Sequence, residues 1–118
     1  MAGGSISKIT PFSGSNYCQM PDGTLLCWGE ISFSAVAVTT AWGNVYESGR
    51  QNVSVSFPVT FIAAPTLYAR LNSSPVTFLE DNLSTSTTGI GGAFWLMRPQ
   101  SITGVGGSIH WLAVGRWK

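Results

Sequence analysis

Apolar and polar residues along this chain alternate with a period of two, which is the period of β-strands. At 52–57, Val53, Val55 and Phe57 share one face of an extended segment and serines occupy the other. At 66–72, apolar side chains alternate with a polar and aromatic stripe. Both segments are typical of antiparallel sheets that bury one face and leave the other in water.

Turn residues divide the chain into further strands. Pro21, Asp22 and Gly23 predict a three-residue turn inside a hairpin at 16–29, because proline presets the first turn position and glycine accepts a left-handed backbone. Runs of β-branched and aromatic residues predict more strands, at 31–41, 44–47, 51–57, 65–72, 75–79, 90–98 and 108–114. Small polar residues predict loops at 83–92 and 103–108.

Two of the later strands are apolar on both faces. The run AlaPheTrpLeuMet occupies 93–97, and at 108–114 the residues on either side of Trp111 are also largely apolar. Such a strand must be covered on both sides, and in a sandwich of this length the second cover has to come from another chain. We therefore predict an oligomer interface at Phe94, Leu96, His110 and Leu112.

Length and charge restrict the class of protein. The 118 residues suit one domain, for which we predict an antiparallel β-sandwich of about six to eight strands at 15–118, after a linker or stalk end at 1–14. Only 9% of residues are charged, which favours self-association over a soluble monomer. Six basic residues form no cluster, so nucleic acid is not an expected partner. The apolar runs are too short for membrane insertion.

The sequence contains few residues that could form a catalytic site or a metal site. The one histidine, His110, lies in the middle of a strand with no evident carboxylate to orient it. Glu80 and Asp81 are adjacent and point to opposite sides if extended, so they suit neither an acid–base pair nor a calcium site. We predict no enzyme activity, no metal and no cofactor.

Cys18 and Cys27 flank the predicted turn. A three-residue turn pairs Met20 with Thr24, which places Cys18 opposite Leu26 and Cys27 opposite Tyr17. The two sulfur atoms would then leave opposite faces of the sheet. A two-residue turn would bring them together, but it needs an N–H that Pro21 lacks. Free thiols are favoured, and a disulfide remains the alternative.

Three blocks of sequence resemble a carboxy-terminal domain family of phage and prophage tail-fibre proteins. They are the hairpin from Tyr17 to Gly29 with its ProAspGly turn and TrpGly end, ValSerPheProValThrPheIleAlaAlaPro at 55–65, and the closing HisTrpLeuAlaValGlyArgTrpLys. This family is similar in layout to the H-type lectins. The resemblance implies a homotrimeric sandwich at the distal end of a tail fibre, located in the virion and attached to the rest of the phage tail.

The function that the resemblance implies is recognition of the host cell surface, with a glycan as the target. Arg98 and Trp95 are the first candidate contacts, because arginine beside an exposed aromatic ring commonly holds a sugar or an acidic group. Tyr68 and Arg70 form a second candidate patch. Trp28, Trp42 and Trp111 are expected to be packing anchors. The alternative function is a structural module that trimerises and caps the fibre without a ligand.

Overall fold

A computed structural model describes residues 12–14, 16–73 and 77–118, and this part of the chain contains strands and no helix. The strands join into a single antiparallel sheet. Their bounds are β2 (Phe12–Gly14), β3 (Tyr17–Gln19), β4 (Thr24–Trp42), β5 (Val45–Ser48), β6 (Gln51–Asn52), β7 (Val55–Ser56), β8 (Thr66–Ser73), β9 (Phe78–Thr85), β10 (Gly89–Arg98) and β11 (Ile102–Arg116). Within the described ranges, nothing has the length and apolarity of a membrane-crossing helix.

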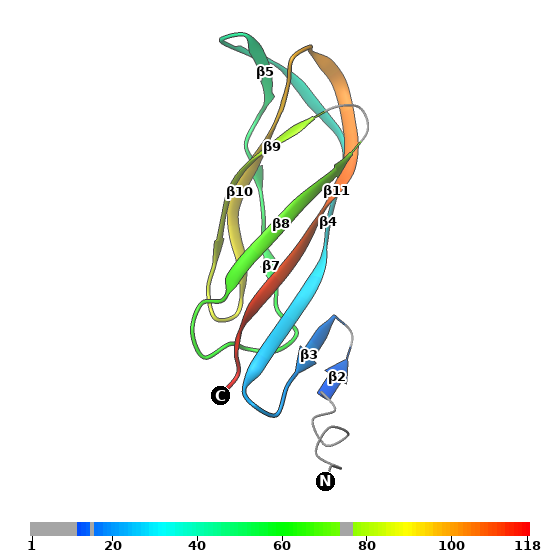
Figure 1. Cartoon of the computed structure of the whole chain (residues 1–118). Coiled ribbons are helices and arrows are strands. Elements are labelled where there is room, and N and C mark those ends of the chain that lie inside the picture. The colour runs from blue at the N-terminus through cyan, green and yellow to red at the C-terminus, as the bar shows by residue number, and fades with distance from the viewer. Residues whose placement is uncertain (1–11, 15, 74–76) are drawn as a thin grey trace.

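Two long strands, β4 and β11, form the centre of the sheet (Figure 1). The first part of β4 lies between β3 and β11, and β8 flanks β11 on its other side. The last part of β4 turns back at Gly43 into β5. β10 pairs along one edge with β5, β6 and β7 in succession. Along its other edge β10 pairs with β9. The sheet thus has a β3–β4–β11–β8 half and a β5–β10–β9 half.

The predicted β3–β4 hairpin is confirmed, including its register. The Met20 N–H donates to the Thr24 carbonyl at 2.7 Å, and Gly23 has φ of +105°. The Thr24 N–H donates to Asp22 at 2.9 Å, which holds the pKa of that carboxyl below its ordinary value. Tyr17 pairs with Cys27 and Cys18 with Leu26. Both cysteines are free thiols, as expected from this register.

The two strands predicted at 24–29 and 31–41 are one strand, β4, because both segments pair with β11 without a break at Glu30, and the strand contains a β-bulge further along. Gly107 pairs with Phe33 but Val105 pairs with Val36, so β4 holds one extra residue, and Ala35 there has φ of +55°. The inward side chains change from odd-numbered positions before the bulge to even-numbered positions after it. The alternation therefore breaks although the strand continues.

The predicted loop at 103–108 is wrong, and the one predicted at 83–92 is confined to residues 86–88. The segment 103–108 lies within β11, and a second irregularity between Ile102 and Val105 adds one residue on that strand opposite the bulge in β4. The segment 83–92 is a β9–β10 hairpin closed by a tight turn, in which the Ser86 N–H donates to the Gly89 carbonyl at 2.9 Å. Small polar residues resemble loop sequences, but here they form ladders with neighbouring strands.

The core lies between the inner faces of the two halves of the sheet. Trp111 of β11 contacts Phe57, with ring centroids 5.7 Å apart, and Phe33 of β4 contacts Phe94 of β10 at the same distance. The aliphatic members come from both halves and are Leu25, Val36, Val38, Val53, Ile90, Leu96, Val105, Ile109 and Ala113. The alternation predicted at 52–57 and 66–72 places the expected apolar residues on the inner side.

Two predicted segments are only partly described. Of the predicted linker 1–14, residues 1–11 lie outside the described part, and Phe12–Gly14 form β2, which pairs with β3. Of the strand predicted at 75–79, residues 75 and 76 lie outside it, and β9 begins at Phe78.

Candidate functional site

The outer face of the β4–β11–β8 half carries an exposed apolar row that crosses three strands. Leu112 of β11 pairs with Trp28 of β4 on one side and with Tyr68 of β8 on the other. Tyr68 is 60% exposed, Trp28 38% and Leu112 36%, although all three are large and hydrophobic. We call this surface, with the charged row beside it, the three-strand face.

The charged row consists of Glu30, His110 and Arg70, each two positions from a member of the apolar row on the same strand. His110 pairs with Glu30 on one side and with Arg70 on the other. The row therefore has a carboxylate at its β4 end and a guanidinium at its β8 end. Two open hollows adjoin this face, one of about 550 Å³ beside Asn16, Trp28 and Glu30, and one of about 240 Å³ beside Tyr68 and Arg70.

His110 has a carboxylate neighbour that the sequence did not reveal. Its Nε2 lies 3.3 Å from Oε1 of Glu30 and 3.3 Å from Oγ of Ser108. In a serine–histidine–carboxylate relay, the carboxylate and the serine contact opposite ring nitrogens. Here both contact the same nitrogen, so this trio does not have the geometry of such a relay.

A second candidate site lies on the outer face of the β5–β10–β9 half. A pocket of about 240 Å³ is lined by Trp42, Glu47, Glu80, Trp95 and Met97. Trp95 pairs with Glu80 across β10 and β9, and Met97 pairs with Glu47 across β10 and β5. Trp42 comes from the end of β4 and is 60% exposed. We call this site the tryptophan pocket.

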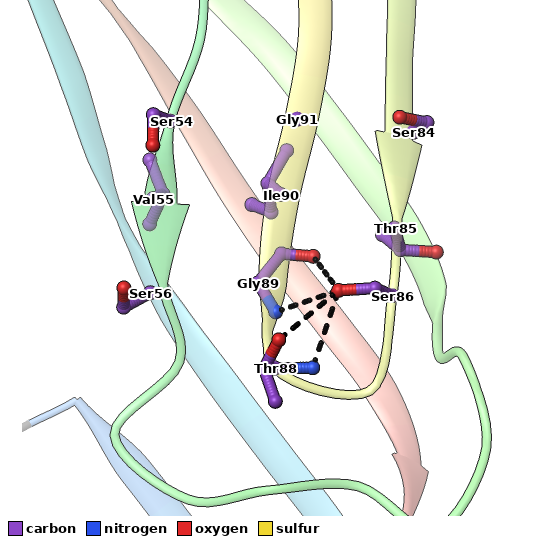
Figure 2. A pocket seen from close by; sticks show the side chains of 10 residues that line it. All are labelled: Ser54, Val55, Ser56, Ser84, Thr85, Ser86, Thr88, Gly89, Ile90 and Gly91. Carbon is purple, nitrogen blue, oxygen red and sulfur yellow. Dashed lines mark hydrogen bonds between the residues drawn. The ribbon is translucent and has the colours of Figure 1, made fainter.

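Another hollow, of about 320 Å³, lies beside the β9–β10 turn, and most of the residues that line it carry hydroxyl groups (Figure 2). The Ser86 hydroxyl is already engaged there, accepting from the N–H groups of Thr88 and Gly89 at 3.3 and 3.2 Å. Gly89 allows β10 to approach β7, since a Cβ at this position would collide with the Val55 carbonyl oxygen. The hydroxyl of Ser86 therefore mainly stabilises the turn.

The structure separates Trp95 from Arg98, which the sequence placed side by side. They are three positions apart on one strand, so their side chains leave opposite faces of it. Arg98 donates to the Gln100 carbonyl at 3.1 Å and does not line the tryptophan pocket. The cation near Trp95 is Arg50, whose guanidinium carbon lies 5.6 Å from the ring centroid. Tyr68 and Arg70 do share a face, beside His110 and Leu112.

Of the four predicted interface residues, two are buried in the core and two are exposed. Phe94 and Leu96 are 3% and 0% exposed, because this face of β10 packs into the chain's own core and cannot contact another chain. The second apolar face of β10 belongs to Trp95 and Met97. His110 and Leu112 are exposed on the three-strand face. The sequence correctly marked β10 as apolar on both sides but assigned the wrong side to the surface.

Of the tryptophans expected to be packing anchors, Trp111 is buried, whereas Trp28 and Trp42 are exposed. The sequence did not predict that Glu30 would adjoin the three-strand face, that Glu47 and Glu80 would line the tryptophan pocket, or that Arg50 would approach Trp95. Glu30 lies beside His110 because β4 pairs with β11, and the sequence alone does not indicate which strands pair. Arg50 and Glu47 lie in the turn region between short strands, where no local pattern indicates a neighbour.

Comparison with known proteins adds no assignment: no protein-family model matches the chain, and no curated protein matches it significantly. Within the described ranges, no three histidine, cysteine or acidic side chains come together in a way that could hold a metal ion. The three-strand face and the tryptophan pocket both place aromatic rings beside charged side chains.

Proposed function

We propose that this chain is a binding and assembly module at the tip of a phage or prophage tail fibre. In this proposal it is a homotrimeric β-sandwich, located in the virion, that recognises a glycan on the host cell surface. The observation that carries the proposal is the exposed row of Trp28, Leu112 and Tyr68 on the three-strand face. Large contiguous apolar surfaces on soluble proteins usually mark contact with another molecule.

The packing of the two halves of the sheet supports the sandwich. Phe57 against Trp111, and Phe33 against Phe94, join the inner faces of the β4–β11–β8 and β5–β10–β9 halves. Outer residues alternate with these inner residues along β8 and β11. This is the arrangement by which a two-layer antiparallel protein fills its core.

The charged row supports assembly as a closed ring. In a ring, one side of each chain meets the other side of its neighbour. The β4 side carries Glu30 and the β8 side carries Arg70, with His110 between them. Head-to-tail contact would place Glu30 near the partner's Arg70, with the apolar row covered alongside. The low proportion of charged residues, 9%, also favours a partly covered surface.

Light scattering at micromolar concentration tests the assembly. We expect about three chain masses for the unaltered protein, and dissociation for Leu112→Glu, which introduces a charge into the apolar row. Ile62→Glu is the matched control, because Ile62 is 61% exposed and does not line the hollows of the three-strand face. A folded monomer at this concentration would contradict the proposed trimer.

A glycan array, followed by binding of the labelled protein to host cells, tests recognition. Three sites on each trimer would raise weak contacts to firm attachment through avidity, so a monomeric Leu112→Glu variant should lose most of its cell binding. Arg98 at the end of β10 remains a separate candidate contact, and Arg98→Ala should reduce cell binding if it touches the ligand. A trimer that binds neither glycans nor cells would support the alternative, a structural module that caps the fibre.

A further inference from the structure

The tryptophan pocket combines aromatic rings with carboxylates. Trp42 and Trp95 supply aromatic rings, and Met97 supplies a polarizable thioether. Glu47 and Glu80 supply two carboxylates on opposite sides of β10, one from β5 and one from β9. Because four separate strands contribute, the sheet itself fixes the relative positions of these side chains.

Among the described residues, the two carboxylates of the pocket form no direct ion pair. In the described part of the chain, neither Glu47 nor Glu80 lies within 4.0 Å of a basic group; the contact of this kind found there joins His110 and Glu30. Arg50 approaches the ring of Trp95, but it lies outside the pocket lining and donates to Asn52 at 2.8 Å. The pocket thus presents two negative charges beside aromatic rings.

We propose that the tryptophan pocket binds an ammonium group, either quaternary, as in choline, or primary, as on an amino sugar. Aromatic faces attract cations through the ring quadrupole, and cages of aromatic rings are a common means of holding quaternary ammonium groups. The two carboxylates add direct charge attraction. This inference rests on the proposed function and sharpens it, since it assigns the host-surface target a positive charge.

The size of the pocket agrees with a single headgroup. Its volume of about 240 Å³ lies below the roughly 300–1,000 Å³ of sites that enclose a drug-sized ligand. A longer glycan would therefore extend over the surface and place only one ammonium-bearing unit in the pocket. A neutral sugar would use the rings for stacking but would leave both carboxylates without charge compensation.

Titration calorimetry with choline and glucosamine, against neutral analogues of the same shape, tests this inference. The analogues are 3,3-dimethylbutan-1-ol for choline and glucose for glucosamine. We expect saturable millimolar binding of at least one ammonium compound, on the order of tenfold stronger than that of its neutral analogue, and weaker at high salt. The compound that binds identifies the quaternary or the primary class. Equal affinity for the neutral analogue, or no binding by either ammonium compound, would overturn the inference.

Variants of the pocket give a second, independent readout. Glu47→Gln and Glu80→Gln should each weaken ammonium binding several-fold with an unchanged melting temperature, because both side chains lie at the surface of the sheet. Arg50→Gln should bind at least as tightly as the unaltered protein, since it removes a competing cation from Trp95. Weaker ammonium binding by Arg50→Gln would contradict the inference, because a guanidinium near Trp95 should compete with the ligand and not assist it.

Cell binding separates failure of this inference from failure of the proposed function. If the unaltered protein and the double variant Glu47→Gln/Glu80→Gln bind cells equally well, the pocket is not the receptor site and the inference is wrong. The proposed receptor-binding function would still stand. If the unaltered protein binds an ammonium compound but no cells, the pocket is confirmed and the proposed function is wrong.

Discussion

The indole ring of Trp111 lies against the backbone of Gly29, its cross-strand partner on β4. A Cβ at position 29 would be 2.9 Å from Cζ2 of the ring and 3.0 Å from Cε2. The absence of a side chain at Gly29 therefore creates the space that the largest core ring occupies. On its other side the ring contacts Phe57 of the opposing half of the sheet. Trp111 is therefore packed between Gly29 and Phe57.

Gly29→Ala should lower the free energy of unfolding by about 1–3 kcal/mol, because the added methyl group forces the Trp111 ring out of its position. Urea unfolding measures this change. Gly49→Ala is the matched control, since nothing lies within 4 Å of a Cβ there, and its effect should stay within about 0.5 kcal/mol. Equal effects of the two substitutions would show that Trp111 does not depend on Gly29.

Trp111→Ala should cost about 3–5 kcal/mol of stability, because it leaves a large cavity between the two halves of the sheet. Trp111→Phe should cost clearly less, since the indole Nε1–H is buried with no hydrogen-bond partner in the described part of the chain, and phenylalanine removes that group. Thermal unfolding compares the two variants. Trp42→Ala, at a 60% exposed position, should leave the melting temperature unchanged.

Ser48→Ala should destabilise the protein by about 1–3 kcal/mol. The Ser48 hydroxyl is buried where β5 gives way to β6, accepts from the Leu96 N–H at 2.9 Å and donates to the Gly49 carbonyl. Alanine would leave a buried N–H without a partner on β10. Ser54→Ala, at an exposed position, is the control. An unchanged urea midpoint for Ser48→Ala would contradict this role.

The two thiols should differ in reactivity. Burial raises the pKa of the Cys27 thiol, and the side chain is 0% exposed, whereas Cys18 is only half-buried. Iodoacetamide at mildly alkaline pH should therefore modify Cys18 in the native protein and Cys27 only after unfolding, because the thiolate is the reactive form. Mass spectrometry of proteolytic fragments measures both. Early modification of Cys27 would show that β4 opens locally.

The raised pKa of the buried Cys27 thiol also predicts that the stability of the protein depends on pH. Above about pH 8.5 the Cys27 thiol ionises in the unfolded chain but stays protonated in the folded one. The unfolded state then binds fewer protons, so the free energy of unfolding falls as the pH rises. Cys27→Ala should lack this part of the decline. Parallel slopes for the two proteins between pH 8 and about pH 10 would contradict the prediction.

Much of the fold follows from local features of the sequence. The ProAspGly turn determined the β3–β4 register, and with it the separation of Cys18 from Cys27, because turn length sets which residues pair. Alternation identified the buried faces of 52–57 and of 66–72, since side chains on a strand leave opposite faces in turn. These conclusions need no knowledge of distant strands.

Other features were decided only by tertiary structure. The segments predicted separately at 24–29 and 31–41 form one strand because both pair with β11, and the bulge around Ala35 is offset by an extra residue on β11. The sequence showed that β10 is apolar on both faces, but only its pairing and the core determined that Phe94 and Leu96 lie inside and Trp95 and Met97 outside. Likewise, Arg50 and not Arg98 reaches Trp95. Which face meets the core, and which charge meets which ring, depends on contacts between segments far apart in the chain, and a periodic pattern carries no information about those contacts.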